Sequence, residues 1–233
     1  MENKSRLLLI SSTALLLGGA AFVGPSIYAS YSEGQAADTP SISLSPSSTS
    51  SSGTASDQPV LAGSWTLSEG SEAGYRVAEV LNGQDVIVTG RTTEVTGNFT
   101  VSQDGSTLES AQFTVDLASV STDSERRDNY FSSTTIDTAT YPTAELLISQ
   151  PVSLGQVEAG ATSSVEVQGE LTLAGVTQPV TFTVDVAGDG QQVQIASSIP
   201  ITFADFGIEA PSLGFVAVEE SGAIEVQLSA IRA

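Results

Sequence analysis

Residues 165–186 read VEVQGELTLAGVTQPVTFTVDV, and this stretch decides the fold. Apolar and polar residues alternate on both sides of Ala174-Gly175. The apolar members are Val165, Val167, Leu171, Leu173, Val180, Phe182, Val184 and Val186. A period of two is the pattern of a β-strand that buries one face, whereas strands of a parallel sheet are buried on both faces. The stretch therefore predicts two antiparallel strands.

The same alternation recurs elsewhere in the second part of the chain. It is found in residues 95–101, 111–117, 193–203 and 224–228. Turn-forming residues stand between the apolar runs, and each is expected to close a hairpin: Asn82-Gly83, Asp104-Gly105, Gly188-Asp189-Gly190 and Ser221-Gly222. Residues 122–139 break the pattern, which predicts a short helix or an ordered loop. Because closure removes exposed sheet edges, we expect residues 65–233 to form one antiparallel β-barrel of about eight strands with one short helix.

The first thirty residues have the layout of an export signal. Lys4 and Arg6 precede an apolar run from Leu7 to Val23, and Gly24-Pro25 ends it. Cleavage after Ala29 is one possibility, and retention as a signal-anchor helix in the membrane is the other. Both place the rest of the chain outside the cytoplasm, either secreted or attached to the cytoplasmic membrane and facing outward.

Residues 31–64 separate this helix from the barrel. Between Ser41 and Ser56, eleven of sixteen residues are serine or threonine. Such a stretch cannot bury enough apolar surface to offset the entropy of ordering, so we expect a disordered linker.

The composition excludes several kinds of chemistry. The chain of 233 residues has no histidine and no cysteine, and its 27 acidic and 7 basic side chains give a net charge of −20. Nucleophilic triads with histidine, zinc sites of cysteine and histidine, and iron–sulfur clusters are therefore ruled out, and we expect neither a metal nor a cofactor. The acidic balance argues against a nucleic-acid partner.

Carboxylates remain as the one catalytic route. Glu166 and Glu170 share the polar face of a strand, but the strand rise sets them about 13 Å apart. Glycoside hydrolysis needs carboxylates at roughly 5–9.5 Å. We therefore expect a protein that is not an enzyme, with no catalytic residues.

The barrel interior leaves two hypotheses. A barrel of about eight strands is either filled by its own side chains or holds one small elongated ligand. Gly97 and Gly169 stand in the inner row, where they either mark bends of the strands or leave space. The domain is then either a binding protein with a tunnel for a hydrocarbon chain, or a self-packed structural or interaction domain without a ligand.

Several local motifs in residues 65–233 occur in a recognisable order. They are Trp65, the VTG…VTGNF segment of 88–99, Thr122 with Arg127-Asp128 and Tyr130-Phe131, Tyr141-Pro142, the GELTLAGVT segment of 169–177, and the DFGI segment of 205–208. In this order they resemble the YceI-like family of polyisoprenoid-binding domains. The resemblance implies a lipocalin-like barrel, in exported bacterial proteins, that takes an isoprenoid quinone or another long apolar lipid into its lumen.

The lumen and its mouth supply the candidate ligand-binding residues. The lumen candidates are Phe99, Phe113, Val115, Phe182, Val184, Ile199, Ile201, Phe203 and Phe206, and the mouth candidates for a headgroup are Arg126, Arg127 and Tyr130. In the alternative interpretation, Asp128 and one arginine pair with each other or cap the short helix. Family members often carry a histidine on an early strand and an arginine where this chain has Phe203. Both departures point to recognition by apolar shape.

Overall fold

The computed structural model describes residues 36–42 and 59–233, so the predicted signal segment and most of the predicted linker lie outside the described residues. No helix within the described ranges combines the length and the hydropathy needed to cross a bilayer. The elements are β1 (Gly63–Leu67), β2 (Glu72–Leu81), β3 (Gln84–Thr92), β4 (Val95–Val101), β5 (Thr107–Asp116), η1 (Leu117–Ser119), α2 (Glu125–Tyr130), η2 (Phe131–Thr135), β6 (Thr143–Ile148), β7 (Val152–Ser153), β8 (Thr162–Leu173), β9 (Val176–Gly188), β10 (Gln192–Thr202), η3 (Phe203–Phe206) and β11 (Val216–Arg232).

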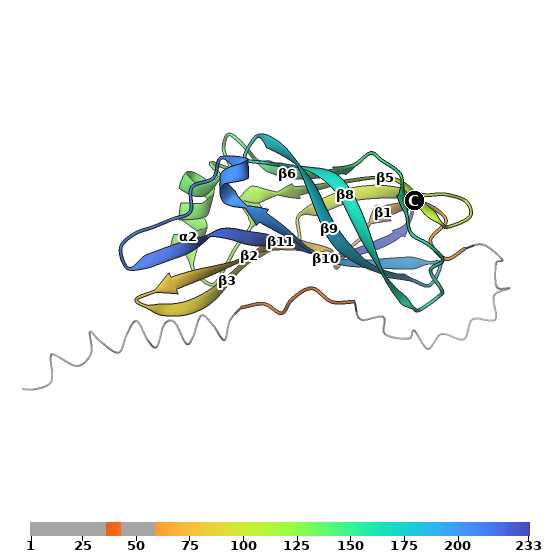
Figure 1. The fold of residues 1–233 in the computed structure, drawn as a ribbon, viewed down its shortest axis with the longest axis horizontal. Helices are drawn as coiled ribbons and strands as arrows, with labels where there is room; N and C mark the ends of the chain where they lie inside the picture. The colour runs from red at the N-terminus through yellow and green to blue at the C-terminus, as the bar shows by residue number, and fades with distance from the viewer. Residues whose placement is uncertain (1–35, 43–58) are drawn as a thin grey trace, which may run out of the picture.

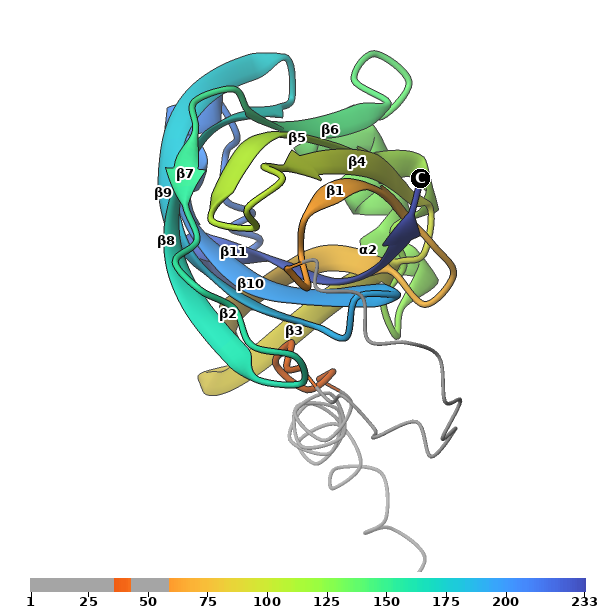
Figure 2. The ribbon, with the colours of Figure 1, turned by 90° about the vertical axis from the view of Figure 1, so that its right-hand side faces the viewer.

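Eight antiparallel strands form a closed ring. Their order is β1-β4-β5-β6-β8-β9-β10-β11, and pairing of β1 with β11 closes it (Figure 2). The segment 165–186 forms the hairpin of β8 and β9, paired from Thr162–Ala187 to Leu173–Val176. The barrel of about eight strands with one short helix is thereby confirmed.

The hairpin of β2 and β3 extends this ring at one end. Residues 216–227 of β11 pair with β2, whereas residues 230–232 of the same strand pair with β1. The two partners therefore follow one another along the same edge of β11. Figure 1 shows the hairpin and α2 at one end of the molecule and the C-terminus at the other.

The predicted turn at Ser221-Gly222 is wrong. β11 runs without interruption from Val216 to Arg232, and its register against β2 shifts between Val218 and Gly222. A Cβ atom at Gly222 would lie 2.8 Å from the carbonyl oxygen of Arg76 and 3.0 Å from the ring of Phe203. The missing side chain of Gly222 thus allows β11 and its neighbours to approach closely at a β-bulge. The other three turns are present, with positive φ at Asn82, Gly83, Gly105 and Gly190.

The hydrogen bonding between β9 and β10 covers only part of their length. These strands pair only through residues 184–188 and 193–197, and Pro179 and Pro200, which lack backbone donors, lie beside the unpaired stretch. The buried Phe206 lies at this stretch, held by η3, while the side-chain amide of Gln178 donates to the Asp205 carbonyl at 2.7 Å. The DFGI segment therefore lies beside the unpaired stretch, and Gly207, at φ 70°, ends η3.

The end of the barrel near the C-terminus is closed by Trp65. Its ring is fully buried and stacks on Phe99 at a centroid distance of 6.1 Å, while the guanidinium of Arg232 lies 4.8 Å from the ring centroid. The indole N–H donates to the carbonyl of Leu61 at 2.8 Å. Leu61 is itself buried and β1 begins at Gly63, so the folded part starts a few residues before the predicted boundary at 65.

A buried ion network lies on the outer face of the sheet. Glu225 is only 1% exposed and accepts from Arg76 at 2.7 Å and from Arg91, which also lies 3.3 Å from Glu72. The described part of the predicted linker, residues 36–42, lies over this network. Its Ala37 donates a backbone N–H to the hydroxyl of Thr89 at 3.0 Å and accepts from Arg76 at 2.5 Å.

Replacing Glu225 by alanine tests the network. Removing one partner of a buried ion pair leaves uncompensated charge, so we expect Glu225→Ala to lower the free energy of unfolding by about 3 kcal/mol in guanidinium denaturation. Glu220→Ala, on the same strand but exposed, is the control and should change it by less than about 0.5 kcal/mol. Equal effects of the two substitutions would contradict a stabilising role of the network.

Candidate functional site

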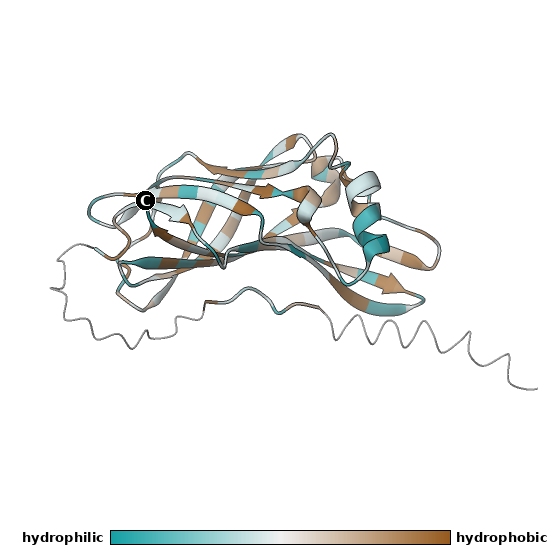
Figure 3. Cartoon of the chain, turned by 180° about the vertical axis from the view of Figure 1, so that it is seen from behind, coloured by the Kyte–Doolittle hydropathy of each residue, from teal (hydrophilic) through white to brown (hydrophobic). Residues whose placement is uncertain are grey.

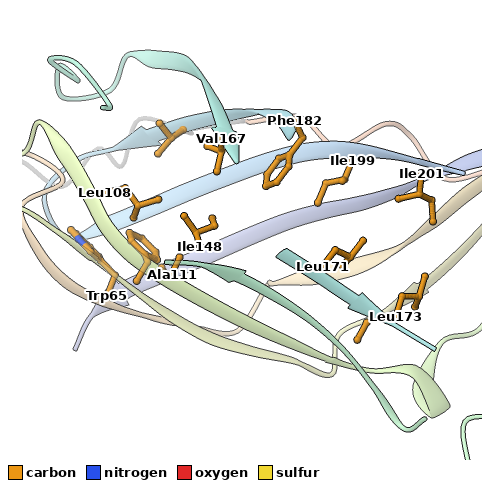
Figure 4. Packing of buried hydrophobic residues seen from close by; sticks show 14 of the residues in the cluster. Trp65, Leu108, Ala111, Ile148, Val167, Leu171, Leu173, Phe182, Ile199 and Ile201 are labelled. Atoms are coloured by element: carbon orange, nitrogen blue, oxygen red, sulfur yellow. The ribbon is translucent and has the colours of Figure 1, made fainter. Parts of the chain in front are cut away.

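A narrow cavity of about 110 Å³ lies inside the ring. Its wall comes from strands all around the barrel, and every lining residue except Glu145 and Ser197 is apolar. Figure 4 shows the side chains of Ala111, Val167, Phe182 and Ile199 directed into this interior. The arrangement follows from the alternation in the sequence, because one row of each strand faces inward.

A wider cavity of about 920 Å³ lies at the end that carries α2 and the β2–β3 hairpin. Val115, Ala144 and Ile224 line both cavities, so the two are neighbours that share a wall. The wider cavity has an apolar floor that includes Leu173 and Ile201, and it also touches charged and hydroxyl groups of β2 and α2. The interior thus changes along the barrel from wholly apolar to mixed.

Arg127 is the central charge of this mixed region. It forms ion pairs with Asp123 and, at 3.7 Å, with Glu79 of β2. Asp128 accepts from the backbone N–H of Thr122 at 2.9 Å and from its hydroxyl at 2.7 Å. The loop before α2 is therefore fixed by Asp128, and the helix is joined to the hairpin through Arg127.

Tyr75 lies beside this pair. Its ring stacks on Phe131 of η2 at a centroid distance of 5.4 Å, and a Cβ at Gly90 would lie 2.4 Å from the ring, so glycine is required there. Burial raises the pKa of Tyr75 to about 12, and the nearby Arg127 opposes the rise. The phenol is therefore a neutral hydrogen-bonding group at physiological pH.

Glu79 is the buried carboxylate of the wider cavity, with 7% of its side chain exposed. Burial raises the pKa of Glu79 above its usual value, and the guanidinium of Arg127 offsets part of that rise. An anionic group at this depth is stabilised by its ion pair and disfavoured by desolvation.

A family model for the YceI-like domain matches residues 65–230. The chain belongs to the YceI-like family. A UPF0312 protein of Pseudomonas putida strain W619 is 32% identical over 124 residues, which cover 49% of this chain and 60% of that protein, and one of strain GB-1 is 31% identical over the same coverage. The aligned stretch thus spans less than two thirds of the length of these relatives.

Two solved structures share the fold of the YceI-like domain. One is a polyisoprenoid-binding domain from Saccharophagus degradans, described as implicated in plant cell wall breakdown. It has a TM-score of 0.58 and 20% identity, and the match covers 72% of this chain and 98% of that one. The other is BcnA of Burkholderia cenocepacia, with a TM-score of 0.51 and 23% identity over 66% of this chain and 95% of that one.

The YceI-like barrel divides the predicted lumen residues between its cavities. Phe99, Phe113, Val115, Phe182, Val184 and Ile199 line the narrow cavity, and Val115, Ile201 and Phe203 line the wide one. Phe206 lines neither of the two; it belongs to the buried core cluster and also lines a third hollow beside the unpaired stretch of β9 and β10. The mouth candidates Arg126, Arg127 and Tyr130 all line the wide cavity. That these residues bind a ligand stays a prediction.

Gly97 and Gly169 mark close contacts between strands. A Cβ at Gly97 would lie 2.5 Å from the ring of Phe113 and 2.5 Å from the Gln112 carbonyl, and one at Gly169 would lie 3.0 Å from the Leu147 carbonyl. Of the two explanations for these glycines, the geometry supports bends and close packing, since neighbouring atoms occupy the space that their missing side chains leave.

Tyr75 and Glu79 are site residues that the sequence analysis missed. They belong to the inward row of β2 together with Ala73, Val77 and Leu81. A carboxylate in an otherwise apolar alternating row was the available signal, because a buried charge requires a partner. The alternation of residues along β2 could not identify Arg127, 48 positions away, as the partner of Glu79.

Glu79→Gln should make the stability of the YceI-like barrel less dependent on pH. Because the pKa of Glu79 is raised in the folded state, the folded protein binds more protons than the unfolded one between the two pKa values, and stability falls as pH rises through that window. We expect the variant to gain stability relative to the wild type as the pH rises above the unfolded-state pKa of a glutamate, about 4.3, in parallel thermal melts. Glu170→Gln, on the exposed face of β8, is the control, and an equal gain there would contradict the assignment to Glu79.

Proposed function

We propose that this protein holds a long apolar lipid, of the polyisoprenoid class, with its tail inside the barrel. The observation that carries the proposal is that two cavities lie next to each other inside the barrel. One is narrow and apolar, and the other, of about 920 Å³, has charged groups at its wall. A volume of this size is within the range of small-molecule sites and favours a ligand over the self-packed alternative. The Saccharophagus degradans neighbour is a polyisoprenoid-binding domain, which supports the choice of lipid class.

The polarity of the interior gives the lipid a direction. A hydrocarbon tail gains free energy from every apolar contact in the narrow cavity, where a polar headgroup would lose its hydrogen bonds with water. At the closed end Trp65 and Leu61 leave no exit for the chain. The tail therefore enters first, and the headgroup stays in the wide cavity.

Arg126 and Tyr130 are the proposed headgroup contacts. Both line the wide cavity, and Arg126 is exposed. Arg127 is held by Asp123 and Glu79, so its role in this proposal is to position α2 at the mouth. A guanidinium suits a phosphate or a quinone oxygen, since it presents several donors in one plane.

We further propose that the protein works outside the cytoplasm as a lipid-binding protein without catalytic activity. The basic end and apolar run of residues 4–23 support export, either with cleavage or with retention as a membrane anchor. The acidic domain suits an exported protein that must stay soluble when it carries a lipid.

Ala144→Phe tests the lipid site. Ala144 is buried and lines both cavities, so a phenyl ring there would take up space where the two adjoin. A ligand that meets this ring faces an overpacking cost of about 1–3 kcal/mol, which corresponds to a loss of about 5- to 150-fold in affinity. We expect organic extraction and native mass spectrometry to find a long-chain lipid with the wild type and much less with the variant.

The control is Ala139→Phe, at an exposed position in the loop after η2 that lines neither cavity, and it should keep the wild-type lipid content. A thermal melt of each variant separates blocked binding from misfolding. Repeated recovery of wild-type protein without lipid, and without a gain in melting temperature on adding an isoprenoid, would sink the proposal.

A further inference from the structure

The loop between η3 and β11 exposes two large apolar side chains at the mouth of the wide cavity. Leu213 is 51% exposed and Phe215 is 58% exposed, the two highest values for large hydrophobic residues in the described part of the chain. Gly214 separates them with φ at 78°. We call residues 213–215 the apolar lip.

The apolar lip is held by backbone hydrogen bonds. The N–H of Leu213 donates to Val216 at 2.8 Å, that of Val218 donates to Pro211 at 3.0 Å, and the Phe215 carbonyl accepts from Asn82 at 2.8 Å. The last bond joins the lip to the tip of the β2–β3 hairpin. Leu213 and Phe215 are therefore exposed on an ordered turn, because backbone hydrogen bonds hold the chain on both sides of them.

The apolar lip is continuous with the ligand cavity. Leu213 and Phe215 line the wide cavity together with Pro211 and Val218, so the same residues face the interior and the solvent. Figure 3 shows hydrophobic segments at this end of the molecule, on the hairpin and on the strand that follows the lip. A lipid that leaves the cavity by this mouth passes along the lip.

The charge around the apolar lip limits what it can bind. Residues 208–215 contain one charged side chain, Glu209, and the domain from 65 to 233 has 23 acidic and 5 basic side chains, a difference of −18. An anionic membrane would repel such a domain, whereas apolar insertion into a zwitterionic surface needs no basic patch.

We propose that the apolar lip inserts into the surface of a lipid bilayer and brings the mouth of the wide cavity against it. Phe215 and Leu213 enter the headgroup region, and the lipid moves between bilayer and barrel without crossing water. The loading role rests on the proposed function, whereas insertion of the lip can be measured without any ligand.

Phe215→Trp in the full chain provides the test. Trp65 is the only tryptophan of the chain and is fully buried at the opposite end, so subtraction of the wild-type spectrum isolates the introduced fluorophore. We expect its emission to shift to shorter wavelength with phosphatidylcholine vesicles and to be quenched when the acyl chains are brominated. Ile231→Trp is the matched control, because Ile231 is 46% exposed at the closed end, and it should be neither shifted nor quenched.

Three outcomes would overturn the proposal. The first is no quenching at position 215, and the second is equal quenching at positions 215 and 231, which would mean contact without orientation. The third is a shift at position 215 that depends on protein concentration and needs no vesicles, because it would assign the lip to contact with a second copy. The comparison of positions 215 and 231 also holds when the N-terminal segment attaches the chain to the vesicles, since both variants carry the same segment.

The double variant Leu213→Ser, Phe215→Ser tests the loading role. Both residues also line the wide cavity, so we expect the double variant to slow the transfer of a fluorescent isoprenoid from vesicles about ten-fold more than it slows loading from detergent micelles. Unchanged transfer would overturn the loading role. Failure to load from micelles in the wild type as well would instead contradict the proposed function, so the two failures are distinguishable.

Discussion

The architecture depends on the division of one edge of β11 between two partners. Residues 230–232 pair with β1 and close the ring, whereas residues 216–227 pair with β2, which belongs to a hairpin outside the ring. Where β1 is the partner, the barrel is narrow and Trp65 fills it. Where β2 is the partner, the wall moves outward and the interior widens into the cavity of about 920 Å³. The bulge that ends at Gly222 lies within the stretch paired with β2, where the glycine permits the close approach of Arg76 and Phe203.

The β2–β3 hairpin takes part in ion pairs on both of its faces. On the outer face Glu225 of β11 lies beneath Arg76 and Arg91, covered by residues 36–42. On the inner face Glu79 meets Arg127 of α2. A hairpin that extends beyond a barrel has a single neighbouring strand, so it relies on such contacts where the ring itself relies on hydrogen bonds from both sides. The ion pairs therefore set the position of α2 and of the wide mouth.

The sequence predicted the elements that depend on local pattern. Alternation over 165–186 identified the hairpin of β8 and β9, and the interruption at 122–139 identified the helical segment with α2 and η2. The features it missed depend on residues far apart in the chain. Gly222 looks like a turn residue until the packing of Phe203 against it is known. The partial pairing of β9 with β10 likewise has no signal in either strand alone. Glu79 is recognisable in the sequence as a carboxylate within an apolar row of β2, but the sequence does not identify Arg127 as its partner.

The same geometry explains why the two ends of the barrel differ in chemistry. Closure by β1 brings Trp65, Phe99 and Arg232 together, and the aromatic stack with its cation fills that end with packed side chains. At the other end β3 ends the order of strands and pairs with β2 alone among the described strands, and an isolated bridge joins Arg91 of β3 to Ser121. Polar groups of α2 and the apolar side chains of the 208–215 loop stand where a further strand would have continued the wall. The wide cavity with its polar and apolar sectors is thus a direct consequence of how the sheet is paired.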